Sequence, residues 1–161
     1  MREITETYKV YTYESASPEL KEKIREYFAM SDSYGDWILE ERMETLKAFA
    51  QYIGAELDYS VSLVPDRGEF IKVKFYGEHI PYRIKDLLND PKACPLTGEC
   101  YDEDLRDFFK ENEVTEENLQ YCLDNYLTLI HNDYECLLSD DVIKEHCEAN
   151  EYEFKEDGTL Y

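Results

Sequence analysis

The sequence predicts an α+β protein in which a small antiparallel sheet packs with helices and is followed by a mostly helical, acidic part. Two observations lead to this fold class. Two neighbouring segments, "AELDYSVSLV" and "EFIKVKFYG", alternate apolar and polar residues as strands do, whereas apolar residues elsewhere recur at the spacing of amphipathic helices. A chain of 161 residues is long enough to bury a core without the help of a metal or a disulfide.

The character of the sequence changes near residue 77, and we expect two parts that form one compact unit. The first part, residues 1–77, should contain a strand, two helices and a hairpin. The second part, residues 78–161, is richer in acidic residues and should be mostly helical, with a final strand.

The first part opens with a predicted strand at 5–15, where "TETYKVYTYES" alternates and is rich in Tyr and Thr. A helix should follow this strand. Ser17 is a favourable N-cap, Pro18 suits the first helical turn, and the carboxylate of Glu19 is favourable near the positive end of the helix dipole. We expect this helix to end near Met30.

A second helix is predicted over residues 37–53, and Gly54 should end it. The hairpin follows, and its turn "PDRG" at 65–68 contains the proline and glycine that are typical of turns. Alternation places Lys72 and Lys74 on one face, as the only small basic cluster of the chain. The other face should carry Leu57, Tyr59, Val61, Leu63, Ile71, Val73 and Phe75.

Four helices are expected in the second part. They correspond to residues 80–90, 101–112, 114–139 and 139–150. The third is the longest, and Thr115 is its expected N-cap. Ser139 or Asp140 should cap the fourth helix, and residues 152–161 should form a final strand that is able to return to the sheet. The apolar stripe of the third helix contains Leu119, Cys122, Leu123, Tyr126, Ile130, Tyr134 and Leu137.

The segment "CPLTGEC" raises the question of a metal site, a disulfide or neither. Five residues separate Cys94 from Cys100, which is wider than the spacing usual in a structural zinc site. Cys122 and Cys136 are about 21 Å apart if they lie on one helix, so they cannot share one metal ion. We therefore expect no metal, while a disulfide between Cys94 and Cys100 stays open. Cys122, Cys136 and Cys147 should act as small core residues.

Motifs of known catalytic sites are missing from the sequence. It contains no nucleophile elbow, no phosphate-binding glycine loop and no zinc-protease motif. His79, His131 and His146 are scattered, as is typical of surface or packing residues rather than bases. We therefore expect a protein that is not an enzyme and that needs no cofactor.

The chain carries 38 acidic and 17 basic residues, and its net charge of −21 is uneven. Residues 1–80 carry a net charge of −6, and residues 81–161 carry a net charge of −15. Such a field repels nucleic acids and anionic membranes and attracts basic partners. An acidic protein without a dedicated partner is the simpler alternative.

The acidic residues concentrate in two segments, 101–117 and 133–157, where basic residues are few. Carboxylates without basic neighbours repel one another, so we expect their retention to serve a use. Successive helical turns space carboxylates on a scale similar to that of nucleic-acid phosphates. We therefore predict a partner-binding surface that mimics DNA. Its expected residues are Asp102, Glu103, Asp104, Asp107, Glu111, Glu113, Glu116, Glu117, Asp140, Asp141, Glu145 and Glu148.

Aromatic residues lie among these acids and are either interface anchors or core residues. A core role is favoured for Phe108 and Phe109, and both roles stay open for the tyrosines. The aromatic residues concerned are Tyr101, Phe108, Phe109, Tyr134, Tyr152 and Phe154.

The sequences at the two ends of the chain are similar to those of a known protein family. "YKVYTYESASPELKEKIREYF" resembles the opening of a family of small, mostly uncharacterised proteins of bacteriophages and prophages of Gram-positive bacteria, some labelled antitoxins. "CEANEYEFKEDGTLY" is similar to their closing phrase, "I-E-A-N-x-Y-x-F-x-x-D-G". The middle departs from the family, with "YSVSLVPDRGEF" where relatives often carry a glycine-rich strand containing tryptophan. The resemblance implies an origin in a mobile element and transfers no catalytic residue.

Small acidic phage proteins are often inhibitors of host defence, and some of them imitate DNA. We therefore expect a viral, non-enzymatic, anti-CRISPR-like inhibitor that blocks a nucleic-acid-binding site on a CRISPR-associated or other defence nuclease. The alternative is an antitoxin-like or regulatory protein that neutralises a basic protein partner. Neither function involves direct binding to nucleic acid or membrane. The N-terminal segment has no apolar signal-peptide core, so we expect the host bacterial cytoplasm as its location.

Overall fold

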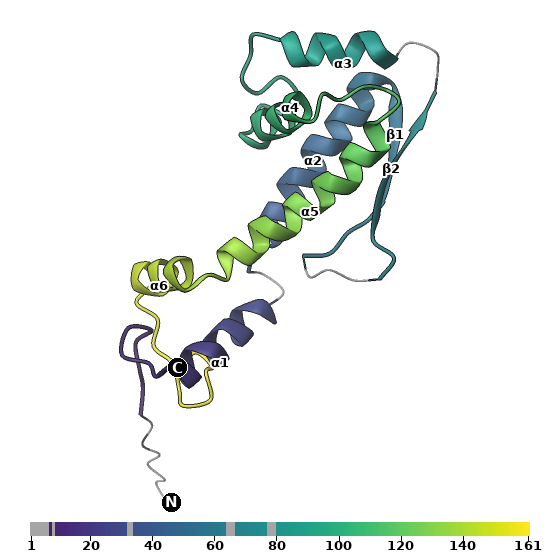
Figure 1. Cartoon of the computed structure of the whole chain (residues 1–161). Coiled ribbons are helices and arrows are strands. Elements are labelled where there is room, and N and C mark those ends of the chain that lie inside the picture. The colour runs from purple at the N-terminus through teal and green to yellow at the C-terminus, as the bar shows by residue number, and fades with distance from the viewer. Residues whose placement is uncertain (1–6, 8, 32–33, 64–66, 77–79) are drawn as a thin grey trace, which may run out of the picture. The chain divides into compact units, whose positions relative to one another are not determined.

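The computed structural model describes residue 7 and residues 9–31, 34–63, 67–76 and 80–161. These described residues form six helices and one two-stranded antiparallel sheet, so the fold belongs to the predicted α+β class (Figure 1). The chain separates into two units, each with its own core. Unit 1 contains Met1–Tyr34 and Glu135–Tyr161, and unit 2 contains Gly35–Tyr134.

Unit 1 brings the two ends of the chain together, so the division differs from the boundary predicted near residue 77. The backbones of Tyr11 and Phe154 exchange two hydrogen bonds of 2.9 Å, and Phe154 also pairs with Leu160. The last segment therefore pairs with the N-terminal segment and not with the sheet. Both pairings are isolated bridges, and part of the strand predicted at 5–15 lies outside the described residues.

Helix α1, Pro18–Ala29, begins as predicted. The Ser17 hydroxyl accepts a hydrogen bond from the backbone N–H of Leu20 at 3.2 Å, and Pro18 occupies the first turn, where its missing N–H costs no hydrogen bond. Helix α6, Asp140–Ala149, follows the predicted N-cap Ser139. The core of unit 1 comes from both helices and from the paired ends, and consists of Tyr13, Ala16, Leu20, Ile24, Phe28, Ile143, Cys147 and Phe154.

Unit 2 begins with α2, Asp36–Ile53, which ends at Gly54 in the left-handed conformation, as predicted. Strands β1, Ala55–Ser60, and β2, Phe70–Phe75, form the predicted hairpin. Leu57 lies opposite Val73 and Tyr59 lies opposite Ile71, so the predicted apolar face is confirmed for these pairs. On the other face, Lys72 lies opposite Asp58 and Lys74 opposite Glu56. Each lysine of the expected basic cluster therefore lies opposite an acidic residue of the neighbouring strand.

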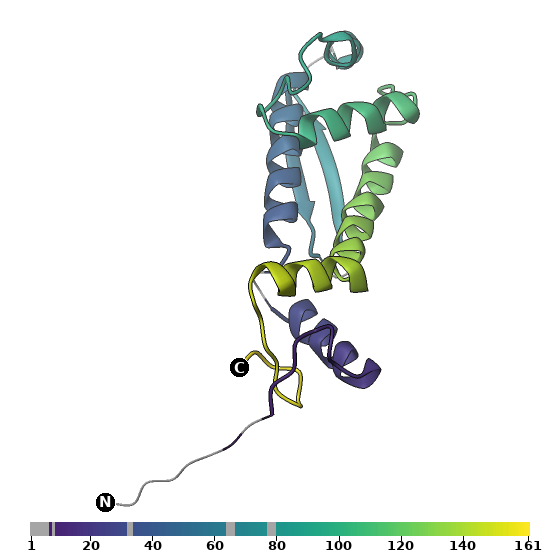
Figure 2. The same cartoon turned by 90° about the vertical axis from the view of Figure 1, so that its left-hand side faces the viewer.

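Three helices complete unit 2. They are α3, Ile80–Asn89, α4, Tyr101–Glu111, and α5, Leu119–Leu137, whose last three residues belong to unit 1. Figure 2 shows α4 running from beside α2 to the start of α5. Leu46, Phe49, Ile71, Leu105, Phe109 and Leu123 are among the fully buried residues of this core. The rings of Phe49 and Phe109 meet edge to face, with centroids 4.8 Å apart, and join α2 to α4.

Helix α5 starts later than the sequence predicts. Thr115 is not its N-cap, because the side chain of Asn118 accepts hydrogen bonds from Thr115 N at 2.6 Å and from Thr115 Oγ1 at 3.2 Å. This local turn holds residues 115–118 outside the helix. The first helical hydrogen bond is then donated by Cys122 N to Asn118 O. The predicted apolar stripe is otherwise buried from Leu119 to Tyr134.

No described helix combines the length and the apolar composition that crossing a membrane requires.

Gly158 provides a test of the packing in unit 1. Its φ is +89°, and a Cβ atom there would lie 2.6 Å from Lys23 Cβ, so we expect Gly158→Ala to destabilise unit 1 by about 3 kcal/mol. Gly68 is the matched control, because its φ is +98° but a Cβ atom would meet nothing within 4 Å. Gly68→Ala should cost only about 1–2 kcal/mol. Urea unfolding followed by circular dichroism measures both, and equal losses would contradict the proposed close packing.

Candidate functional site

The twelve predicted partner-binding acids belong to both units. Eight of them, from Asp102 to Glu117, lie in unit 2, and four, from Asp140 to Glu148, lie in unit 1. They therefore form two sets, each with its own surroundings.

Helix α4 turns one face to the core and the other to solvent. Leu105 and Phe109 are fully buried, whereas four carboxylates are exposed on the other side. These four, named here the α4 acidic row, are Glu103, Asp104, Asp107 and Glu111. They span about 12 Å of helix axis, or about one charge per 4 Å. A single strand of duplex DNA carries about one charge per 3.4 Å, so the charge density of the row approaches that of one DNA strand.

The basic residues of α4 leave most of this row unneutralised. Arg106 is buried, and its guanidinium donates hydrogen bonds to the backbone carbonyls of Asp90 at 2.7 Å, of Ala93 at 3.0 Å and of Lys92. Lys110 forms an exposed ion pair of 3.4 Å with Asp107. Arg106 therefore acts on neutral groups, and only Lys110 acts on the row from within α4.

Arg42 of α2 supplies the second cation, from a buried position. Its guanidinium donates a hydrogen bond of 2.9 Å to the Tyr126 hydroxyl and forms ion pairs with Asp133 and, at 3.5 Å, with Asp104. It also lies 4.3 Å from the centroid of the Tyr101 ring. Burial alone would lower the pKa of Arg42, but Tyr126 and Asp133 outweigh it and raise the pKa. Burial raises the pKa of Tyr126 to about 12, although Arg42 opposes this shift.

Asp102 does not belong to the exposed surface, which corrects the sequence prediction. Its side chain is fully buried, and Oδ2 accepts hydrogen bonds from the backbone N–H groups of Leu96, Thr97 and Gly98 at 2.8, 2.7 and 3.0 Å. Oδ1 accepts from the hydroxyls of Thr97 and Thr45. Burial opposes ionisation, but the hydrogen bonds, led by that from Gly98, outweigh it and lower the pKa of Asp102. The "CPLTGEC" segment thus folds around one carboxylate.

The remaining acids of unit 2, Glu113, Glu116 and Glu117, are exposed in the turn between α4 and α5. Glu113 adopts a φ of +46°, which is uncommon for a residue with a side chain. Among the described residues, neither these three carboxylates nor Glu103 and Glu111 form an ion pair. Five of the eight predicted acids of unit 2 are therefore exposed and form no ion pair with another described residue.

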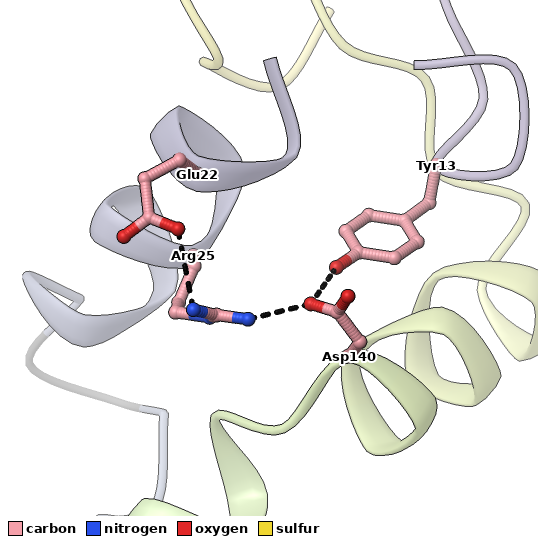
Figure 3. Close-up of polar contacts among 4 residues, drawn as sticks. All are labelled: Tyr13, Glu22, Arg25 and Asp140. Atoms are coloured by element: carbon pink, nitrogen blue, oxygen red, sulfur yellow. Dashed lines mark hydrogen bonds and ion pairs between the residues drawn. The ribbon is translucent and has the colours of Figure 1, made fainter. Parts of the chain in front are cut away.

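In unit 1, Asp140 makes internal contacts (Figure 3). Its Oδ1 accepts hydrogen bonds from the Tyr13 hydroxyl at 3.0 Å and from Arg25 Nη2 at 2.5 Å, and Arg25 also pairs with Glu22 at 3.2 Å. The bond from Tyr13, followed by the contact with Arg25, lowers the pKa of Asp140. Burial and the bond to Asp140 raise the pKa of Tyr13. Asp140 thus ties α6 to α1 and to the N-terminal segment.

The other acids of α6 differ in their surroundings. Glu148 lies 3.6 Å from Lys144 Nζ, which also contacts Glu14 at 3.6 Å. Asp141 and Glu145 are exposed, and no ion pair forms on them within the described part of the chain. Only these two residues of unit 1 match the predicted exposed, unneutralised acids.

The aromatic residues among the acids belong mainly to the cores. Tyr101, Phe109, Tyr134 and Phe154 are buried, and Phe108 and Tyr152 are half-buried. On α5, Tyr121 is 67 % exposed.

The cysteines follow the prediction only in part. Cys122 and Cys147 are buried core residues, whereas Cys136 is exposed, because it falls on the solvent side of α5. Cys94 and Cys100 are both free thiols. Within the described residues, no group of three or more His, Cys, Asp or Glu side chains is placed to hold a metal ion.

The histidines pack against neighbours. His131 Nε2 lies 3.2 Å from the carbonyl oxygen of Ser62 and 3.3 Å from the Glu69 carboxylate. The His146 ring packs edge to face against Phe28, with centroids 5.5 Å apart. His79 lies outside the described residues.

Sequence reasoning missed Arg42 and Thr45, which are buried polar residues on α2. Both occupy positions on the apolar stripe that contains Ile38, Leu46 and Phe49. A charged residue within such a stripe indicates a buried partner, and this pattern was available in the sequence. The identity of the partners, Tyr126 and Asp133, was not available.

Comparison with protein-family models, with curated proteins and with solved structures finds no match for the chain. The resemblance of its two ends to a phage protein family therefore stays a prediction.

Asp102 provides a test of the loop. We expect Asp102→Asn to destabilise unit 2 by about 2–3 kcal/mol, because an amide NH2 group would face N–H donors. The folded-state pKa is lowered, so the stabilisation from Asp102 is complete above its unfolded pKa of about 3.9 and is lost as the pH falls through the folded value. The difference in stability between the unmodified chain and the Asp102→Asn variant should therefore be smallest at low pH. Exposed Glu103→Gln is the control, and a comparable loss there would contradict this role.

Arg42 provides a test of the buried cluster. We expect Arg42→Met to cost about 3–5 kcal/mol, because it leaves Asp133 and the Tyr126 hydroxyl without their buried partner. Lys110→Met removes an exposed ion pair and should cost less than about 1 kcal/mol. Chemical denaturation of both variants measures the difference. Similar losses for the two variants would show that the Arg42 cluster is not buried in solution.

Proposed function

We propose that the chain is a non-enzymatic inhibitor that occupies a nucleic-acid-binding groove on a basic partner protein, and that this partner is a defence nuclease of the bacterial host, such as a CRISPR-associated nuclease. The binding surface is the α4 acidic row, extended by Glu113, Glu116 and Glu117. The observation that carries the proposal is the charge density of the row, about one carboxylate per 4 Å.

The arrangement of the cations in unit 2 supports this function. Arg106 is fixed on backbone carbonyls, and Arg42 is buried, so neither presents its charge to an approaching partner. A groove lined with Lys and Arg that evolved to hold phosphates would therefore meet carboxylates at similar spacing. Association by such fields is fast and weakens steeply with salt.

The anchoring of α4 also supports the proposal. Asp102 and Arg106 fix the inner face of the helix to the preceding loop, so the carboxylates on the outer face project from a rigid element. A preorganised charged surface loses less entropy on binding than a flexible one. Tyr121 is exposed on α5 and would offer a partner an aromatic contact on the same unit.

The test uses affinity capture from a lysate of bacteria that carry defence systems, at low and at high salt. We expect the captured partner to be a nucleic-acid-binding protein, and DNA or guide RNA to compete with the chain for it. Affinity should fall about tenfold or more between 50 and 200 mM salt. A partner that binds no nucleic acid would favour the antitoxin-like alternative.

A charge-neutral triple variant locates the surface. We expect Glu103→Gln, Asp107→Asn and Glu111→Gln together to weaken binding at least about tenfold, because three contacts with cations are lost. The matched control changes Glu40, Glu44 and Asp86, which are exposed acids of the same unit. Calorimetric titration compares the two variants. Equal weakening would indicate a general effect of net charge and would exclude a specific α4 surface.

A further inference from the structure

The hairpin of unit 2 is a sheet of two strands, so each strand has one edge that pairs with the other strand and one outer edge. Just beyond the paired residues, Tyr76 N donates a hydrogen bond of 3.1 Å to Gly54 O. Because hydrogen-bonded and non-hydrogen-bonded pairs alternate along an antiparallel ladder, this bond places Leu57 and Tyr59 in non-hydrogen-bonded pairs. Their backbone N–H and C=O groups therefore point away from β2, toward the outer edge of β1.

The two outer edges of the hairpin differ in their contacts. On β2, the carbonyl of Ile71 accepts a hydrogen bond of 2.8 Å from Gln120 Nε2 of α5. This bond agrees with the alternation, because Ile71 lies opposite Tyr59 and its carbonyl should also point outward. On β1, the outward groups of Leu57 and Tyr59 have no hydrogen-bond partner among the described residues. The outer edge of β1 thus offers donors and acceptors with which an added strand can pair.

The solvent-facing side of β1 is acidic. Glu56 and Asp58 are exposed there, opposite Lys74 and Lys72 of β2, and Figure 1 shows α2 and α5 on the other side of the hairpin. Glu56 accepts a hydrogen bond from the neutral Tyr76 hydroxyl, but neither acid forms an ion pair within the described part of the chain. Opposite charges on neighbouring strands attract. A third strand beside β1 should therefore place basic side chains on this face.

The core-facing side of β1 is apolar. Leu57 is half-buried and packs against the core of unit 2, and Tyr59 is 39 % exposed. Lys47 of α2 already supplies a positive charge on this side, because its Nζ lies 5.6 Å from the centroid of the Tyr59 ring. Further basic groups would be unfavourable here, whereas apolar side chains would extend the contact surface of Leu57 and Tyr59. A third strand should therefore place apolar residues on this face.

We propose that the outer edge of β1 binds an extended segment of a partner protein in which basic and apolar residues alternate. The segment adds a third strand to the hairpin and forms backbone hydrogen bonds with Leu57 and Tyr59. Its basic side chains lie beside Glu56 and Asp58, and its apolar side chains lie on the side of the core. A third strand also favours the sheet itself, because a hairpin of two strands is only marginally stable. The site uses no residue of the α4 acidic row, so the inference does not depend on the proposed function.

The experiment measures, by fluorescence polarisation, the binding of the full chain to a labelled peptide of alternating lysine and valine residues. In an extended peptide, the N–H groups of the lysines point to one edge and those of the valines to the other. Two further peptides carry N-methyl groups, one on two of its lysines and the other on two of its valines. These peptides have the same charge but block opposite edges.

We expect one methylated peptide to bind at least about tenfold more weakly than the parent peptide, because it loses hydrogen bonds to β1. The other should bind within about twofold of the parent peptide. A loss with methylated valines indicates an antiparallel third strand, and a loss with methylated lysines indicates a parallel one. Equal affinities of the two methylated peptides would overturn the proposal, since binding to acidic residues by charge alone does not distinguish them. Absence of binding by the parent peptide would also overturn it.

Variants of β1 locate the site. Tyr59→Pro removes the ring and the outward N–H, whereas Tyr59→Ala removes only the ring, so we expect the proline variant to bind the parent peptide at least about fivefold more weakly than the alanine variant. Glu56→Gln with Asp58→Asn should weaken binding about fivefold. The matched control, Glu40→Gln with Asp86→Asn, changes exposed acids of the same unit and should alter binding less than about twofold. Equal effects of the two double variants would overturn the proposal. The methylated peptides are tested on the unmodified chain, so a variant that fails to fold leaves that test intact.

Discussion

One buried carboxylate organises the part of unit 2 on which the proposed surface depends. Asp102 gathers three N–H groups of the loop that precedes α4, and Arg106, one turn further on, gathers three carbonyl groups of the same connection. The two side chains are four residues apart and therefore lie on one face of the helix. The segment between α3 and α4 has few backbone hydrogen bonds of its own. Its N–H and C=O groups instead find hydrogen-bond partners in one anionic and one cationic side chain of α4.

This inner pairing determines what the outer face of α4 can carry. Because Arg106 is used on backbone carbonyls, it does not offset the acids on the other side of the helix, and the negative potential of the α4 acidic row is preserved. Arg42 reduces the repulsion among the carboxylates of the row through its ion pair with Asp104. Because Arg42 is buried, it does so without presenting a positive charge to solvent. Stability and an exposed negative surface are therefore compatible in the same helix.

Local patterns were sufficient to predict most helices and the hairpin. Ser17 with Pro18, and Gly54 after an apolar stripe, are determined by short-range chemistry, and the structure confirms both. The start of α5 was predicted wrongly because Asn118 offers Thr115 a competing hydrogen bond. The pairing of Tyr11 with Phe154 joins residues that are distant in sequence, and no local pattern contains that information.

At the candidate site, too, the sequence alone could not predict which residues are exposed. Composition identified the acids of α4 as a group, but it treated Asp102 and Asp107 alike, although one is buried and the other exposed. What distinguishes them is the set of amide donors that the loop brings to Asp102, and this set exists only after the loop has folded. A carboxylate that receives several N–H donors contributes structure, whereas one that receives none remains available to a partner. In an acidic protein, counting the donors around each carboxylate therefore separates scaffold from surface better than counting charges.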